Sequence, residues 1–291
     1  MADCPEKIIE VLFFRDIKMH EHDPDDGKRF QVSITLAGAK MVNQVLESGY
    51  KGDKAFDPES VLTPDEPFLT KFTGVIMKTI LCYGDSNTFG HNPQNNNRLK
   101  RYERWPGILE KGLGPEYQVI EEGLNHRTTI RDDPALEYVN GKVYLTPCLN
   151  SHKPVDLVIL MLGSNDLKCR FNLSASDIAD GIGVLAGIIL KSGTGPKGRS
   201  PELLILSPPR FGRITRYAEM FQGYEEKEKK LAPYYELAAK DYGCHYLDIS
   251  NHIQCPDTDG LHMEKPEHEK QGNLLTPVVQ NILNTKVPVI S

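Results

Sequence analysis

The sequence has no apolar run that approaches the roughly 18 residues of a membrane-spanning helix. Its first 30 residues are charged throughout and lack the apolar centre of a secretory signal peptide. It also has no excess of positive charge, because 34 lysines and arginines stand against 40 aspartates and glutamates, which gives a net charge of -6. We therefore expect a cytoplasmic protein whose main partners are neither nucleic acids nor membranes.

The sequence has few cysteines, and they show no recognisable pattern. None of the six belongs to a CxxC pair or to a spacing typical of a metal site. In the absence of an export signal, reduced thiols are expected and disulfides are not. The acidic cluster at 20–26 (HEHDPDD) matches no structural zinc pattern and is interpreted as a solvated loop.

The composition is that of a folded soluble protein, with 39% apolar and 25% charged residues in a chain of 291. Within residues 1–76, alternation at 30–36 predicts a short strand, helical spacing follows at 41–46, and a turn-rich connector occupies 49–74. Met77 stands directly before the next apolar run. We interpret 1–76 as an N-terminal extension of unknown role, a small αβ piece with a linker, or as an upstream segment absent from the mature protein.

Beyond this extension, apolar runs alternate with helical patterns. The apolar runs lie at 79–83, 117–121, 156–162, 202–207 and 244–249, and the helical patterns at 105–113, 174–189, 225–242 and 266–283. Strands that alternate with helices predict parallel βαβ units with right-handed crossovers. We therefore predict an α/β fold, a three-layer α/β/α flavodoxin-like sandwich whose five-stranded parallel sheet has the order 2-1-3-4-5.

In that order, the loops after the first three strands meet at one cleft. The first loop carries Ser86, within GDSN. A serine hydroxyl needs a base, usually a histidine oriented by a carboxylate, and Asp259 and His262 follow the fifth strand. The roughly eleven residues that lead from this strand to Asp259 can span about 35 Å, more than the roughly 14 Å across three strands. These residues predict a Ser–His–Asp triad.

Such a triad also needs hydrogen-bond donors for the oxyanion that forms on the substrate. The candidates are the side-chain amide of Asn165, in the GSND loop, and the backbone N–H groups of Ser86 and of the GLNH loop at 123–126. The serine does not lie in a GxSxG elbow, because Thr88 occupies the fifth position. That argues against an ordinary α/β-hydrolase.

Four ordered blocks carry a family resemblance. GDSN with Ser86, GLN at 123–125, GSND with Asn165 and DGLH with His262 resemble the blocks of the SGNH (GDSL-type) hydrolases. The similarity covers most of 77–291, which is interpreted as an SGNH hydrolase domain. The segments VIEEGLNHRTT and LVILMLGSNDLK are closest to the bacterial arylesterase and acyltransferase branch.

The resemblance implies an acyl-serine intermediate on Ser86 and no required metal or organic cofactor. It also implies that Asp259 orients His262 and that the oxyanion donors are the N–H of Ser86, the N–H of His126 and Asn165. The family usually has glycine or another small residue where His126 stands. A backbone N–H survives this change, but the bulky ring is expected to narrow the cleft or to touch the substrate.

The same residues also have structural interpretations. Ser86 alone would suit a helix N-cap and Asn165 a turn, and Asp257 lies two residues before Asp259 as a second candidate carboxylate. The four blocks together favour the catalytic interpretation of each.

Four further residues near these blocks are assigned roles without a motif of their own. Trp105 and Phe89 are predicted to bind substrate, with core packing or a subunit contact as the alternative. Asp85 is interpreted as a structural residue of the serine turn, and His91 as a surface or satisfied histidine.

We therefore predict a serine esterase that hydrolyses small carboxylic esters. Formation of homo-oligomers is an expectation that rests on the family resemblance alone. An acyltransferase or a carbohydrate O-deacetylase with the same triad is the alternative among enzymes. A catalytically silent binding or assembly protein is the alternative from another class, and the presence of every residue that the chemistry needs disfavours it.

Overall fold

The computed structural model describes residues 18–21, 30–33 and 77–284. The chain divides into two compact units, residues 1–74 and 75–291. In the first unit, β1 (Lys18–Glu21) and β2 (Phe30–Ser33) pair in antiparallel fashion. β2 therefore forms at the start of the strand predicted at 30–36. The helical pattern at 41–46 and the connector at 49–74 lie outside the described residues, and the role of this unit stays a prediction.

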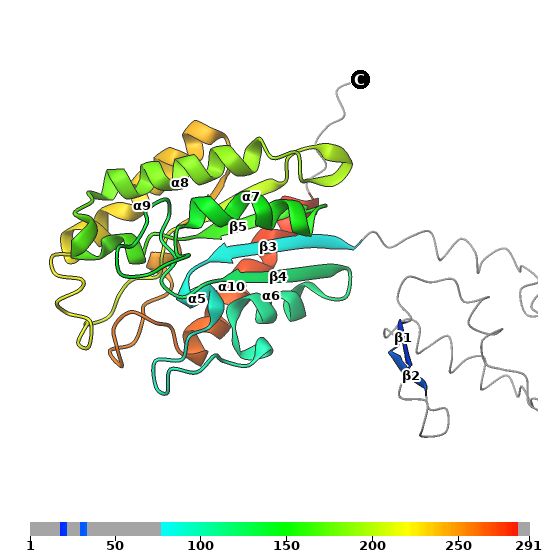
Figure 1. Ribbon diagram of the computed structural model, residues 1–291, viewed down its shortest axis with the longest axis horizontal. Helices are drawn as coiled ribbons and strands as arrows, with labels where there is room; N and C mark the ends of the chain where they lie inside the picture. The colour runs from blue at the N-terminus through cyan, green and yellow to red at the C-terminus, as the bar shows by residue number, and fades with distance from the viewer. Residues whose placement is uncertain (1–17, 22–29, 34–76, 285–291) are drawn as a thin grey trace, which may run out of the picture. The chain divides into compact units, whose positions relative to one another are not determined.

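In the second unit, five parallel strands form one sheet in the order β4-β3-β5-β6-β7 (Figure 1). The strands are β3 (Lys78–Gly84), β4 (Tyr117–Gly123), β5 (Leu157–Met161), β6 (Glu202–Leu206) and β7 (His245–Leu247). Within this unit the order is 2-1-3-4-5, so the predicted flavodoxin-like topology is confirmed. The register pairs Gly84 with both Gly123 and Met161. The loops after β3 and its two neighbours therefore begin at the same level.

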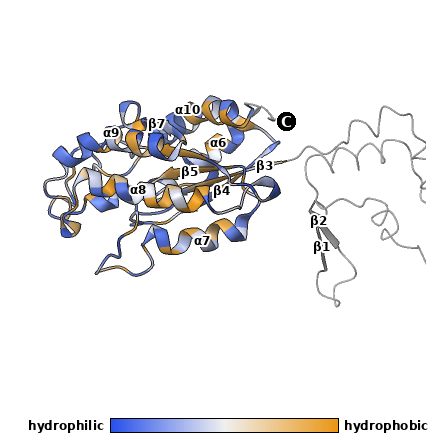
Figure 2. Ribbon diagram, turned by 90° about the horizontal axis from the view of Figure 1, so that it is seen from above, coloured by the Kyte–Doolittle hydropathy of each residue, from blue (hydrophilic) through white to orange (hydrophobic). Residues whose placement is uncertain are grey.

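Helices cover both faces of this sheet, and Figure 2 shows α6 and α10 on one side and α7 and α8 on the other. The helices are α6 (Trp105–Leu113), α7 (Gly141–His152), α8 (Ala175–Leu190), α9 (Glu225–Tyr242) and α10 (Lys265–Asn284). α6 and α10 pack with Ile80 and Ile159, whereas α7, α8 and α9 pack with Leu81 and Val158. Successive strand residues point to opposite faces, so each strand contributes to both cores. Among the described residues, no helix is long and apolar enough to cross a membrane.

Capping signals in the sequence set several helix boundaries. Ser174 Oγ accepts a hydrogen bond from the Asp177 N–H at 3.1 Å, and the Ser174 N–H donates to Asp177 Oδ2 at 2.8 Å, which starts α8 with a capping box. α6 and α9 stop at Gly114 and Gly243, both of which have positive φ. The sequence patterns did not predict α7, which contains Pro147.

A one-turn helix, α5 (Ser86–Phe89), follows β3 directly. Glycines at two strand ends leave room for it. A Cβ at Gly123 would lie 2.1 Å from the backbone nitrogen of Phe89, and a Cβ at Gly84 would lie 2.0 Å from Thr88 Oγ1. Because both positions lack a side chain, α5 packs closely against β4 and holds Ser86 at the carboxyl edge of the sheet.

Candidate active site

The turn after β3 presents Ser86 as the first residue of α5. Asp85 caps this helix, because its Oδ1 accepts a hydrogen bond from the Asn87 N–H at 3.0 Å. The side chain of Asp85 is thus part of the turn, as the sequence interpretation expected. Ser86 retains only 7% of its accessible surface, so its hydroxyl lies in a nearly closed environment.

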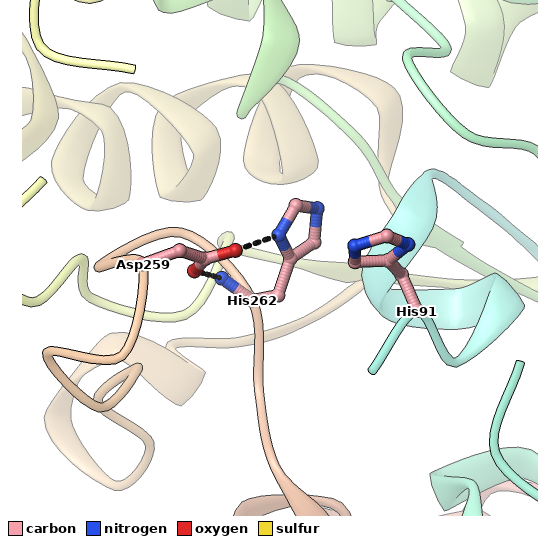
Figure 3. Close-up of side chains that lie close together, drawn as sticks. All are labelled: His91, Asp259 and His262. Carbon is pink, nitrogen blue, oxygen red and sulfur yellow. Dashed lines mark hydrogen bonds and ion pairs between the residues drawn. The ribbon is translucent and has the colours of Figure 1, made fainter. Parts of the chain in front are cut away.

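Ser86, His262 and Asp259 form a continuous chain of hydrogen bonds. His262 Nε2 lies 2.9 Å from Ser86 Oγ, and His262 Nδ1 lies 2.6 Å from Asp259 Oδ2. Figure 3 shows the Asp259 carboxylate pointing at the His262 ring. The other carboxylate oxygen accepts hydrogen bonds from the backbone N–H groups of Leu261 at 2.8 Å and His262 at 2.9 Å. One carboxylate therefore builds the turn and orients the imidazole.

The ionisation of Asp259 follows from these contacts. Burial alone would raise the pKa of Asp259, but the hydrogen bond and charge of His262 and the two backbone N–H groups outweigh it and lower that pKa below the ordinary value. Asp259 is therefore an anion at neutral pH. Asp257, the alternative carboxylate, instead accepts the Arg213 N–H at 2.8 Å.

Asn87 joins the serine turn to the histidine segment, and the sequence analysis did not single it out. Its Nδ2 donates to the Leu261 carbonyl at 3.2 Å, and its Oδ1 accepts the Met263 N–H at 2.9 Å. These two hydrogen bonds hold the backbone in place on either side of His262. The signal in the sequence was the position of Asn87 inside the GDSN block.

The GLNH and GSND loops bring further donors to the same edge. Asn165 is buried, and its Nδ2 donates to the Arg127 carbonyl at 3.2 Å, which leaves its second N–H for another acceptor. Within the described residues, the backbone N–H groups of Ser86 and His126 donate to no acceptor. His126 has φ of 67°, in the left-handed region that favours glycine. This conformation accounts for the small residues that the family resemblance associates with this position.

Charged side chains hold these two loops. Arg127 Nη1 donates to the Gly84 carbonyl at 2.9 Å and also to the Glu122 carbonyl, and its guanidinium lies 4.2 Å from the centroid of the Tyr83 ring. Asp166 accepts hydrogen bonds from the Thr129 N–H and, at 2.6 Å, from the Thr129 hydroxyl. Burial raises the pKa of Asp166 to about 6, although the bonds from Thr129 act in the opposite direction.

His91 lies against His262, so its interpretation as a surface or satisfied histidine was wrong. Its ring centroid is 4.3 Å from that of His262, the two rings are tilted by 49°, and Figure 3 shows them side by side. Its Nε2 is buried and has no hydrogen-bond partner among the described residues. Burial, together with the charge of His262, lowers the pKa of His91 to about 4, so this imidazole is neutral at physiological pH. The ligand atoms of His91, Asp259 and His262 lie within 4.8 Å of one another and could also hold a metal ion.

The two predicted substrate-binding aromatics differ in placement. Trp105 is completely buried in the core between α6 and α10, and its backbone N–H donates to His268 Nδ1 at 3.3 Å. The prediction that Trp105 binds substrate was therefore wrong, and the core-packing alternative holds. Phe89 is half-buried at the end of α5, and the guanidinium carbon of Arg98 lies 4.4 Å from its ring centroid. Its contact with substrate stays a prediction.

Comparison with known proteins places this geometry in context. The sequence model of the GDSL-like lipase/acylhydrolase family matches residues 82–268. The solved aryl esterase of M. smegmatis is 37% identical, with a TM-score of 0.68 over 71% of this chain and 100% of the other. A carbohydrate acetylesterase family member from Sinorhizobium meliloti is also 37% identical, with a TM-score of 0.68 over 71% and 99% of the two chains. No match was found among curated proteins.

Proposed function

The chain belongs to the GDSL-like lipase/acylhydrolase family and is a carboxylic ester hydrolase, and we propose that it cleaves small esters through an acyl-serine intermediate on Ser86. The observation that carries this proposal is the unbroken hydrogen-bond chain from Asp259 through His262 to Ser86, with links of 2.6 and 2.9 Å. Such a chain meets the geometric requirement for activating a serine hydroxyl.

In the proposed reaction, His262 Nε2 accepts the proton of Ser86 as Oγ attacks the carbonyl carbon of the ester. The negative charge that forms on the carbonyl oxygen is stabilised by the free N–H of Asn165 and by the backbone N–H groups of Ser86 and His126. His262 then donates its proton to the departing alcohol oxygen, which leaves the acyl group on Ser86. Asp259 keeps the imidazole oriented and stabilises its charged form throughout.

The second half of the reaction uses the same groups. His262 removes a proton from water, whose oxygen attacks the acyl carbon, and the carboxylic acid departs as Ser86 regains its proton. An alcohol that replaced water would yield a new ester, which is the transferase alternative. Measuring products in the presence of excess alcohol separates hydrolysis from transfer.

Burial around Ser86 favours a small acyl group. Ser86 and Asn165 keep 7% and 4% of their accessible surface, so little space separates the nucleophile from its surroundings. The side chain of His91 is half-buried beside them, and that of His126 is exposed. These two imidazoles can form hydrogen bonds and also suit an alcohol that bears hydroxyl groups. Deacetylation of a carbohydrate is therefore a second candidate function, and two similar solved structures from Sinorhizobium meliloti carry the name carbohydrate acetylesterase.

The proposal is tested by hydrolysis of p-nitrophenyl esters, from acetate to octanoate, and of an acetylated sugar, with the full chain and its Ser86→Ala variant. We expect the highest rate with acetate and loss of activity in the variant. Equal rates for both proteins would exclude Ser86 as the nucleophile. A Ser192→Ala variant, which changes a serine outside the site, serves as the control and should keep the full rate.

A further inference from the structure

A second group of reactive side chains lies between α7 and the end of β4. Cys148 and His152 occupy one face of α7, because residues four apart in a helix lie above one another. Both approach Glu122 of β4. His152 Nε2 lies 2.8 Å from Glu122 Oε1, and the ligand atoms of all three residues lie within 4.8 Å of one another. None of the three belongs to the hydrogen-bond chain of Ser86.

We propose that Glu122, Cys148 and His152 form a binding site for a divalent transition-metal ion of the zinc class. Thiolate, imidazole and carboxylate are the ligands that zinc takes in proteins, at about 2.0–2.3 Å. Ligands at that distance from one ion are separated by roughly 3–4 Å in a tetrahedral arrangement, so small side-chain rotations bring the three atoms into place. The ion replaces the thiol proton of Cys148, which passes to water, and binds lone pairs of the other two ligands.

The surroundings leave one coordination position open. Cys148 is completely buried, whereas the side chains of Glu122 and His152 keep 20% and 29% of their accessible surface. Water therefore reaches the outer side of the group and can supply the fourth ligand. Arg127 lies nearby, with its guanidinium carbon 5.7 Å from the centroid of the Tyr144 ring on the same helix. This positive charge weakens cation binding, so we expect lower affinity than in four-ligand structural zinc sites.

An ion at the proposed site would link α7 to the end of β4. Glu122 directly precedes the loop that carries His126, and Cys148 and His152 belong to a helix that covers the sheet beside it. A bound ion would therefore fasten α7 to the strand end from which the proposed oxyanion loop begins. Because the ion binds the folded chain and not the unfolded one, it should raise the melting temperature.

Cobalt(II) is the probe for this site, since it occupies zinc sites and its absorption reveals thiolate ligation. The full chain is titrated with Co²⁺ under reducing conditions. We expect a thiolate-to-cobalt charge-transfer band that saturates at about one ion per chain and disappears when Zn²⁺ is added. The Cys148→Ser variant should lack the band, and His152→Phe should bind Co²⁺ at least about tenfold more weakly.

Two controls separate this site from other ligands of the chain. A variant with both Cys4→Ser and Cys169→Ser should keep the band, because Cys169 is an exposed thiol and Cys4 lies outside the described residues. His245→Phe should also keep it, because His245 pairs with Glu202 at 3.4 Å and does not belong to the proposed group of ligands. Binding at His91 and His262 would give no thiolate band, so it cannot be mistaken for this site.

Absence of the band in the wild-type chain at saturating Co²⁺ would overturn the proposal, as would its persistence in Cys148→Ser. If Cys148→Ser fails to fold, Glu122→Gln replaces it, because the amide keeps the size of the carboxylate. Unchanged Co²⁺ affinity in Glu122→Gln would equally overturn the proposal, whereas a loss of at least about tenfold supports it.

Discussion

The turn after β3 and the loop after β4 begin side by side, yet different kinds of interaction hold them. An amide and a carboxylate fix the turn, since Asn87 binds the backbone on both sides of His262 and Asp85 Oδ1 accepts the Asn87 N–H. Charged groups fix the loop, namely the guanidinium of Arg127 and the buried carboxylate of Asp166. Neutral hydrogen bonds keep their geometry across a wide pH range, whereas a buried charge depends on its protonation state. The backbone on either side of His262 is thus held by neutral hydrogen bonds, whereas the loop is held by charged side chains.

The largest loss of activity is expected from replacement of His262, the base in the proposed reaction. His262→Ala should lower kcat for p-nitrophenyl acetate by about 10⁴–10⁶-fold, because the Ser86 proton then has no acceptor. Asp259→Asn should cost up to about 10⁴-fold, since it removes the charge that orients the ring. Circular dichroism establishes that each variant is folded. A loss of less than tenfold in His262→Ala would mean that another group is the base.

Removal of one proposed oxyanion donor, the side-chain amide of Asn165, should cause a smaller loss of activity. Asn165→Ala is expected to lower kcat by about 10²–10³-fold with little change in KM, because the donor acts on charge that exists only in the transition state. Asn150→Ala, which removes an exposed amide on α7, is the matched control and should leave kcat unchanged. A rise in KM alone would assign Asn165 to substrate binding instead.

Loosening the turn tests whether Asn87 positions the base. Asn87→Ala should lower kcat about 10–100-fold through misplacement of His262. It should also reduce the free energy of unfolding by about 1–3 kcal/mol, because the Leu261 carbonyl and the Met263 N–H lose their partner. Urea unfolding and steady-state kinetics on one preparation give both numbers. Unchanged kinetics with reduced stability would limit Asn87 to a structural role.

The pH dependence of stability tests the part that the buried carboxylate of Asp166 plays in holding the loop. The pKa of Asp166 is raised from 3.8 to about 6, so between these values the folded chain binds a proton that the unfolded chain does not. Protonation of Asp166 therefore stabilises the folded chain at low pH, and this contribution is lost as the pH rises through about 6. Relative to Asp166→Asn, the wild type should lose up to about 1.4 kcal/mol per pH unit in this window. Parallel curves for the two proteins would contradict the raised pKa.

The smallest effect is expected for His126→Gly. The backbone N–H remains, and glycine accepts φ of 67° without strain, so activity on acetate should stay within about threefold and stability within about 1 kcal/mol. Without the ring, longer acyl chains should become better substrates, which the p-nitrophenyl series measures. A loss of more than tenfold on acetate would show that the imidazole itself takes part.

Local patterns were sufficient for most of the fold. The apolar runs located all five strands of the sheet, and the helical patterns at 105–113, 174–189, 225–242 and 266–283 located four helices, because these signals act within a few residues. The helix α7 was missed because its apolar residues do not gather on one face: Leu145 and Leu149 are buried, whereas Val143 and Tyr144 are exposed.

Contacts between residues that are far apart in the chain could not be predicted from the sequence. Trp105 was taken for a pocket residue because nothing near it in the chain reveals its packing under α10, with His268 some 163 positions away. Asn87 and Arg127 escaped notice for a related reason, since their partners are backbone groups, which leave no pattern in the sequence. The blocks identified which residues meet, but not the interactions that hold them there.

The central claim is that Ser86 carries the acyl group, and labelling with a fluorophosphonate followed by peptide mass mapping tests it most directly. The account predicts one adduct per chain, on the peptide that contains Ser86, with no labelling of Ser86→Ala and slow labelling of His262→Ala. An adduct on another residue, or equal labelling of Ser86→Ala and the wild type, would contradict it.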